Sequence, residues 1–249
     1  MYDAMRAHFG PQDWWPASRT LPRAERKLEV CVGAILTQNT NWRNVEKALG
    51  NLLDAGCMRI AALAGLTEAR LAELIRPAGY FNVKARRLKR FLEAVADGAG
   101  GDIEAFLDRP AARLREALLA IHGIGPETAD SMILYAAGRC TFVVDAYTRR
   151  IFARHGLVEP GANYDAVKAL CELRVPARTA LYNDYHAQLV AVGKTYCRPT
   201  ARCEGCPLAA FPHDRRGDRG PAFRRRAARA GRSGGSVVRD DGSSRDGRA

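Results

Sequence analysis

Apolar residues recur at helical spacing through most of the chain, and this pattern limits the fold more than any other feature of the sequence. Leu28, Val32 and Ile35 fall on one helix face, and residues 88–95 repeat the pattern. The period-two alternation that marks a half-buried strand is essentially absent, and only residues 142–144 form a short run that could be extended. Many helices of about three turns, joined by short connections containing Gly or Pro, predict an all-α fold.

The charge of the chain is strongly positive. The sequence has 39 Lys and Arg against 27 Asp and Glu, a formal net charge of +12 at pH 7. Residues 213–249 contribute +6, from eleven Arg and five Asp, and the other 212 residues contribute the remaining +6. Such an excess favours a polyanionic partner, with nucleic acid ahead of a membrane surface. No run of eighteen apolar residues is present, so a membrane-spanning segment is not expected.

The segment 213–249 is rich in Gly, Ser, Arg and Asp, and its large apolar groups are only Phe223, Val237 and Val238. So few apolar groups cannot offset the entropy of ordering the chain, and a disordered basic tail is predicted. The tail either holds DNA by charge alone or is a solvated extension without a role.

A glycine hairpin, Gly123-Ile124-Gly125, joins two predicted helices, and Pro126 opens the second of them. Glycine permits left-handed dihedrals and close approach of another backbone, while Ile124 is suited to fill the space between the helices. The exposed amides would then converge at a helix start, where partial positive charge favours a phosphate oxygen. An ordinary tight connection between two helices would use the same residues.

The hairpin and Thr128-Ala129 after it resemble the helix-hairpin-helix of the endonuclease III superfamily of DNA glycosylases. Residues 142–150, FVVDAYTRR, resemble the second hallmark of that superfamily, an aspartate that starts a helix. Residues 30–49 resemble its helix and DNA-wedge segment, and the likeness extends over roughly residues 10–210.

This resemblance implies two helical domains that flank a DNA-binding groove. Residues 20–137 would form a six-helix barrel that ends in the helix-hairpin-helix at 114–137. Residues 1–19 and 138–212 would form the second domain, with a Cys-rich loop at 197–206. The implied protein is a monomer that acts on damaged double-stranded DNA. With no secretion leader expected, its location would be the cytoplasm, on the nucleoid if the source is prokaryotic.

Asp145 is the candidate catalytic residue. Breaking an N-glycosidic bond develops positive charge on the deoxyribose, and a nearby carboxylate stabilises that charge and orients the attacking water. Asp145 follows an apolar run and opens an amphipathic helix, so it would lie at the edge of a core. An aspartate at this place is also an ordinary helix N-cap.

Glu127 departs from the family pattern. Members of the superfamily that also cut the DNA backbone carry a lysine two residues after the second hairpin glycine, where it forms a Schiff base. This chain has Glu127 at that position, and a carboxylate cannot form an imine. Lys84 lies far upstream and does not match the motif. A monofunctional glycosylase with little lyase activity is therefore expected.

Trp14, Trp15 and Pro16 resemble the amino-terminal segment of the 3-methyladenine glycosylases of the endonuclease III type, which lines the pocket for the extruded base. N-alkylated purines such as 3-methyladenine are cationic, and indole faces attract cations by about 0.5–2 kcal/mol. The resemblance therefore favours alkylated purines. Adjacent tryptophans would equally serve to anchor the amino terminus on the core.

Gln38 and Asn39 match the wedge position of the superfamily, where a side chain fills the gap left by a flipped base. Their short amides could hydrogen-bond the orphaned partner base. They could instead cap the helix that begins near Asn41.

Three of the seven cysteines, Cys197, Cys203 and Cys206, lie in a Pro- and Arg-rich segment with gaps of five and two residues. The segment resembles the carboxy-terminal [4Fe–4S] loop of endonuclease III, which has four cysteines and a first gap one residue longer. Pro212 stands where the fourth cysteine would fall, and His213 is next to it. Ligation by His213, loss of the cluster, and zinc in its place all remain open.

Two other functions fit the same sequence. An endonuclease III-like enzyme would act on oxidised pyrimidines and would also cut the strand at the abasic site. A non-catalytic helix-hairpin-helix module would bind bent or damaged DNA without releasing a base.

Overall fold

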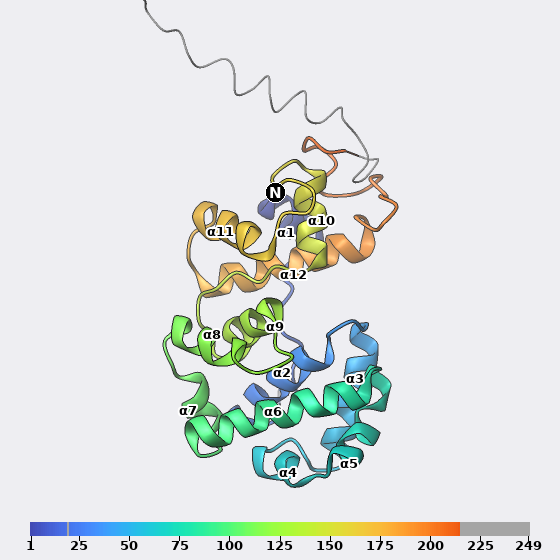
Figure 1. The fold of residues 1–249 in the computed structure, drawn as a ribbon. Coiled ribbons are helices and arrows are strands. Elements are labelled where there is room, and N and C mark those ends of the chain that lie inside the picture. Colours follow the sequence, from blue (N-terminus) through green and yellow to red (C-terminus); the bar gives the residue numbers. More distant parts are fainter. Residues whose placement is uncertain (19, 215–249) are drawn as a thin grey trace, which may run out of the picture.

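A computed structural model describes residues 1–18 and 20–214, and over these residues the chain is helical with no β-strand. The all-α prediction is confirmed. The structure has two hydrophobic cores, one built by α2 to η2 and the other by α1 and α10 to α12 (Figure 1). Of the predicted disordered tail, residues 215–249 lie outside the described residues. No helix in the described part is long and apolar enough to cross a membrane.

The first core contains ten elements, and α2 is at its centre. Every residue of α2 from Leu28 to Leu36 is buried, and α2 contacts α3, α6, α7, α9 and η2. The ten elements are α2 (Arg23–Leu36), α3 (Trp42–Asp54), α4 (Ile60–Gly65), α5 (Glu68–Leu74), η1 (Arg76–Ala78), α6 (Phe81–Ala99), α7 (Ile103–Leu107), α8 (Ala111–Leu119), α9 (Pro126–Ser131) and η2 (Met132–Ala136).

The second core contains the first helix of the chain and the last three. They are α1 (Tyr2–Phe9), α10 (Ala146–Arg154), α11 (Tyr164–Arg174) and α12 (Thr179–Thr195). The Tyr2 hydroxyl donates to Asp184 Oδ2 at 2.7 Å, which joins α1 to α12. Gly193 permits a close crossing of α12 and α10, because a Cβ there would lie 2.3 Å from a Tyr147 ring carbon.

The chain thus begins beside α12 and then passes into the first core through residues 10–22 (Figure 1). Trp14 and Trp15 lie in this connection. The two cores meet at η2, because Leu134 belongs to the second core while the neighbouring Ile133 belongs to the first. Trp15 of this connection and helix α12 therefore both contact η2 at the junction of the cores.

Asp130, on α9, is a buried polar link between the two cores. Its side chain is 0% exposed and accepts from Arg115 Nε at 3.0 Å, from Lys168 Nζ at 2.9 Å and from the Tyr164 hydroxyl at 2.8 Å. Arg115 belongs to α8, whereas Lys168 and Tyr164 belong to α11. This network fixes α11 against the helix that follows the hairpin.

Asp130→Ala is expected to lower the free energy of unfolding by about 3–5 kcal/mol, because it removes the fully buried partner of Arg115, Lys168 and Tyr164 and leaves the two cations only their more exposed partners, Asp165 and Glu172. Asp165→Ala is the matched control: Asp165 also pairs with Arg115, at 3.2 Å, but its side chain is 74% exposed. An exposed pair is worth at most about 1 kcal/mol. Urea unfolding of both variants measures the difference, and equal losses would contradict the role given to Asp130.

Candidate active site at the junction of the two cores

The glycine hairpin has the conformation that its sequence predicts. Gly123 has φ of 98°, in the left-handed region, and a Cβ there would lie 2.7 Å from Arg87 Cγ. Ile124 is 4% exposed and packs into the first core. Gly125 is the N-cap of α9, and within the described part of the chain its N–H has no hydrogen-bond partner. The hairpin thus presents backbone donors while its apolar residue is buried.

Gln38 fastens the turn after α2 to the hairpin. Its Nε2 donates to the Gly123 carbonyl at 3.1 Å and to Thr128 Oγ1 at 2.9 Å, and Arg87 donates to its Oε1. Asn39, in contrast, is exposed and has φ of 54°. The helix at Trp42 is capped by Asn41, whose side chain accepts from the Asn44 N–H at 3.1 Å. Gln38 and Asn39 therefore do not cap this helix.

Asp145 is the N-cap of α10, and its two carboxylate oxygens have different surroundings. Oδ1 accepts from the Thr148 N–H at 2.7 Å, while Oδ2 lies 3.7 Å from His186 Nε2. The residue is 8% exposed. Capping therefore occupies one oxygen and leaves the second facing the junction of the cores. The capping and catalytic interpretations of Asp145 do not exclude each other.

An aromatic cluster adjoins Asp145 through His186 and Tyr135. His186 Nδ1 lies 2.5 Å from the Tyr135 hydroxyl, and the Tyr135 ring centroid lies 5.2 Å from that of Trp15. The Trp15 ring centroid in turn lies 5.1 Å from that of Trp42. The sequence pattern alone favours a packing role for His186, and the structure places it beside Asp145. The sequence alone could not identify His186 as a site residue, because η2 and α12 are distant in the chain and meet only at the junction of the cores.

Trp14 and Trp15 differ in their surroundings. Trp15 packs on the first core, with its ring against Gly33 on α2. The ring centroids of Trp14 and Trp42 lie 6.1 Å apart, and Lys194 Nζ lies 5.6 Å from the Trp14 ring centroid. Both indole Nε1 atoms are buried without a partner among the described groups. Pro16 is exposed. Trp15 therefore anchors the connection between the two cores. The indole N–H groups of both tryptophans remain without a hydrogen-bond acceptor among the described residues.

Two carboxyl groups with opposite pKa shifts face the junction. Burial would raise the pKa of Asp145, but His186 and the Thr148 N–H stabilise its anion and hold the pKa below its usual value. Glu127 has its pKa raised to about 7, first by the surrounding protein and then by the charge of Asp145, while His186 and Arg149 oppose the shift. The Glu127 side chain is exposed to solvent.

Lys84 is not available as a nucleophile. Burial lowers the pKa of its ammonium to about 8, and Nζ donates at 2.8 Å to the carbonyls of Leu36 and Ala78. These carbonyls belong to the ends of α2 and η1, so Lys84 caps two elements inside the first core.

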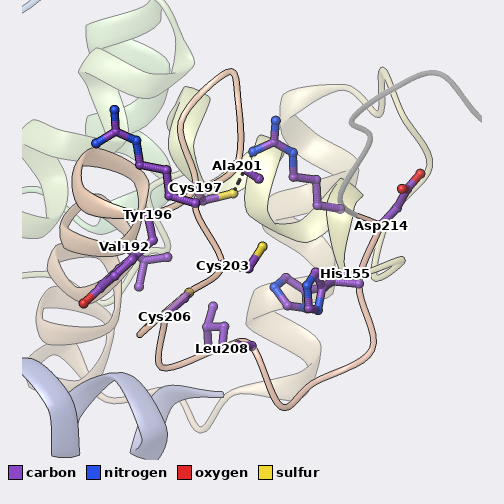
Figure 2. Close-up of a pocket in the computed structure, with 13 residues that line it drawn as sticks. His155, Val192, Tyr196, Cys197, Ala201, Cys203, Cys206, Leu208 and Asp214 are labelled. Atoms are coloured by element: carbon purple, nitrogen blue, oxygen red, sulfur yellow. Dashed lines mark hydrogen bonds between the residues drawn. The ribbon is translucent and has the colours of Figure 1, made fainter.

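The Cys-rich segment lies in the second core, beyond α12. Cys197, Cys203 and Cys206 are free thiols that line one pocket, and Figure 2 shows the ring of His155 across from them. Burial raises the pKa of Cys206, and the neighbouring Cys203 and Cys197 add to the shift. Among the described residues, no three His, Cys, Asp or Glu side chains are grouped closely enough to hold a single metal ion.

The family model for the HhH-GPD superfamily of base excision DNA repair proteins matches residues 32–177, which include the hairpin and Asp145. The chain belongs to this superfamily. It is 43% identical over 212 residues, 85% of its length and 93% of the relative's, to a Methanocaldococcus jannaschii protein provisionally named a DNA repair glycosylase. It is 30% identical to the chloroplastic endonuclease III homolog 1 of Arabidopsis thaliana over 78% of this chain, which spans about half of that relative.

Solved structures of HhH-GPD glycosylases have the same fold. The 3-methyladenine DNA glycosylase of H. pylori bound to 1,N6-ethenoadenine aligns with a TM-score of 0.64 and 28% identity, over 78% of this chain and 96% of that one. A non-covalent endonuclease III–DNA complex aligns with a TM-score of 0.68 and 20% identity, over 85% and 91% of the two chains. The expected resemblance to the endonuclease III and 3-methyladenine glycosylase branch is confirmed, and the chain is a DNA repair glycosylase of this superfamily.

Proposed function

We propose that this HhH-GPD protein is a monofunctional DNA N-glycosylase that excises alkylated purines such as 3-methyladenine from double-stranded DNA. The observation that carries the proposal is the continuity of the site, from the Asp145 carboxylate through His186 and Tyr135 to the tryptophan cluster. A carboxylate for the sugar and an aromatic cluster for the base are thus linked through two side chains. The enzyme would act as a monomer in the cytoplasm.

The base pocket would be formed by Trp14, Trp15 and Pro16, with Trp42 behind them. Lys194 Nζ at 5.6 Å from the Trp14 ring centroid indicates that this face attracts a cation. A cationic 3-methyladenine ring would gain from the same interaction by displacing the Lys194 ammonium from this face. The unpartnered indole N–H of Trp14 would supply a donor to a nitrogen acceptor of the base. Binding of the damaged base would thereby satisfy one buried polar group, whereas the Trp15 Nε1 lies against Gly33 on α2.

In the reaction, the bond between C1′ and the base nitrogen breaks, and its electron pair leaves with the alkylated base. Positive charge develops on the deoxyribose, where the ionised Asp145 stabilises it. A water molecule then forms the new bond to C1′ and loses a proton, which leaves an abasic site. Because alkylation already weakens the glycosidic bond, one carboxylate without an acid for the leaving group is sufficient.

The DNA strand would be held by the hairpin, in the groove between residues 20–137 and the second domain of residues 1–19 and 138–212. Backbone donors at Gly123 and Gly125, with the side chain of Thr128, would contact phosphate, while the Ile124 N–H donates to the Ile121 carbonyl at 3.0 Å and holds the turn in shape. Gln38 and Asn39 would enter the gap left by the everted nucleotide. Asn39 is free to do so, whereas Gln38 must first exchange its bonds to the hairpin.

Glu127 would contact the strand beside the reacting sugar, without covalent chemistry. A carboxylate at this position cannot form an imine with the abasic sugar, and Lys84 is buried inside the first core. The product would therefore be an intact strand with an abasic site.

A panel of duplexes tests the substrate assignment. Free base is measured by mass spectrometry after incubation with duplexes that carry 3-methyladenine, thymine glycol or no lesion. We expect release of 3-methyladenine at least about tenfold faster than release of thymine glycol, a difference of about 1.4 kcal/mol in transition-state binding. Faster release of thymine glycol would favour the endonuclease III-like function, and DNA binding without any release would favour the non-catalytic module.

The ionisation of Glu127 predicts a pH dependence of DNA binding. With a pKa of about 7, Glu127 is largely neutral below that pH and becomes an anion above it, where it repels the phosphate strand. The Kd of the wild type for a duplex with a tetrahydrofuran abasic analogue should rise by up to about tenfold from about pH 6 to about pH 8. Glu127→Gln should flatten this dependence, as measured by fluorescence anisotropy. An unchanged slope in Glu127→Gln would assign the titration to another group.

A further inference from the structure

His186, on α12, lies between the Tyr135 hydroxyl and the Asp145 carboxylate and is itself buried. It is 6% exposed, with Nδ1 at 2.5 Å from the Tyr135 hydroxyl and Nε2 at 3.7 Å from Asp145 Oδ2. A hydrogen bond between nitrogen and oxygen is about 2.7–3.2 Å long, so Nε2 is near the carboxylate but does not bond to it. Nε2 has no other partner among the described groups. A buried and unused polar atom therefore faces the candidate catalytic carboxylate.

Tyr135 belongs to a π-helical turn at the junction of the cores. The Ala137 N–H donates to the Met132 carbonyl, five residues back, at 3.0 Å. Such turns are rare and are frequently found at functional sites. The Tyr135 ring packs on both cores, and burial together with the charge of Asp145 raises the pKa of its hydroxyl. The hydroxyl is therefore neutral and able to donate.

These contacts determine where His186 carries its hydrogen. When the Tyr135 hydroxyl donates to Nδ1, the hydrogen of the neutral imidazole is on Nε2, toward Asp145. The opposite tautomer would turn a lone pair toward the carboxylate anion, which repels it. An imidazolium also carries a hydrogen on Nε2, so Asp145 Oδ2 meets an N–H in either protonation state.

We propose that His186 and Tyr135 are positioning residues for Asp145. The Tyr135 hydroxyl orients the imidazole, and the imidazole Nε2–H holds Asp145 Oδ2 against the sugar. The bond from Nε2 to Oδ2 is open in the free protein and closes when DNA covers the junction, as hydrogen bonds of active sites often tighten only in the complex. It then stabilises the carboxylate anion while positive charge develops on the deoxyribose. This role rests on the part proposed for Asp145 in base excision.

Other charged groups near Asp145 have to be separated from the effect of His186. Glu127, on α9, interacts with both Asp145 and His186 and has a pKa of about 7, while Arg149, on α10, interacts with Glu127. The Tyr135 hydroxyl on η2 is neutral. The pH dependence is therefore measured in a Glu127→Gln background, which removes the titration of Glu127.

The test measures single-turnover base release from the lesion duplex on which the wild type is most active. His186→Phe keeps a ring without nitrogen, and Tyr135→Phe removes only the hydroxyl. His186→Gln keeps an amide near the position of Nε2, whereas the shorter His186→Asn reaches only the position of Nδ1. Tyr185→Phe is the matched control, because Tyr185 is next to His186 in the chain but packs on Phe142 in the second core. Circular dichroism and thermal unfolding report whether each variant is folded.

We expect His186→Phe to release the base about 10–10²-fold more slowly, which corresponds to one hydrogen bond to a charged group. His186→Gln should recover part of this loss and His186→Asn none of it. Tyr135→Phe should be about 2–10-fold slower, as for a neutral hydrogen bond, and Tyr185→Phe should keep the wild-type rate. The Kd for a duplex with an abasic analogue should not change, because these side chains lie away from the proposed strand contacts.

The pH profile separates positioning from packing. The ionised Asp145 is the active form, and His186 favours it, so loss of His186 raises the pKa of Asp145. In the Glu127→Gln background, the activity of His186→Phe should therefore fall at a higher pH than that of the parent as the pH is lowered. A defect of packing alone would lower the rate at every pH and leave the acid limb in place.

Three results would overturn the positioning role. They are a folded His186→Phe with the wild-type rate, equal rates for His186→Gln and His186→Asn, and an acid limb that does not move. If Asp145→Asn is slow while His186→Phe is not, only the positioning role fails. If Asp145→Asn itself keeps the wild-type rate, the part proposed for Asp145 fails, and the positioning role fails with it.

Discussion

Asp145→Asn is expected to slow base release by about 10²–10⁴-fold, which is the usual loss when a positioned carboxylate is removed from a reacting centre. The amide has nearly the same shape and keeps an oxygen to accept from the Thr148 N–H, so α10 retains its cap. The variant loses only the negative charge that faces His186 and, in the proposed reaction, the sugar. Single-turnover release of 3-methyladenine, with enzyme in excess over DNA, measures the effect directly.

Two controls make this result specific. The affinity of Asp145→Asn for a duplex with an abasic analogue should remain within a few-fold of wild type, and its thermal unfolding should be little changed. Thr148→Val is a second comparison, because it keeps the Thr148 N–H that caps the helix and the Asp145 charge, and removes only a buried hydroxyl beside that carboxylate. If Asp145→Asn releases the base at a rate near that of the wild type, the carboxylate takes no part in the reaction.

Glu127→Lys is expected to create a lyase activity that is not expected of the wild type. Glu127 faces Asp145 closely enough for the two charges to interact, so a lysine there would reach the same sugar. Arg149 and the surrounding protein would favour its neutral amine, which is the form that attacks C1′. The amine would form an imine with the abasic sugar, with loss of water, and the strand would then break by β-elimination.

Borohydride reduction measures this gain, because it converts the imine into a stable protein–DNA adduct. We expect an adduct from Glu127→Lys and none from the wild type or from Glu127→Gln, which controls for loss of the negative charge. An adduct from the wild type would contradict the monofunctional assignment. No adduct from a folded Glu127→Lys that binds DNA would show that residue 127 lies too far from the sugar.

The parts of the site that the sequence could predict are the local ones. The hairpin at Gly123 to Gly125 and the helix start at Asp145 are each determined by a few consecutive residues, so their geometry follows from turn and capping rules. The helical fold follows in the same way from apolar spacing. The domain boundaries at 19/20 and 137/138 stay predictions.

The remaining parts depend on contacts between distant segments. His186 and Tyr135 are 51 residues apart and meet only because α12 packs on η2, so nothing in the local sequence distinguishes His186 from a packing histidine. The side chain of Gln38 hydrogen-bonds to Gly123, which is 85 residues away in the chain. Gln38 therefore stabilises the hairpin and is also a candidate wedge residue. Local spacing predicted a Cys-rich loop, but that His155 lines the same pocket as its thiols is seen only in the folded structure.

A crystal structure of Asp145→Asn with a duplex that carries a stable analogue of 3-methyladenine tests the central claim most directly. The account predicts that the damaged nucleotide is everted, with its base against Trp14 and Trp15. The side chain of residue 145 should lie within about 3–3.5 Å of C1′ or of a water poised to attack it. A lesion base still stacked in the duplex, or a sugar bound away from residue 145, would contradict the account.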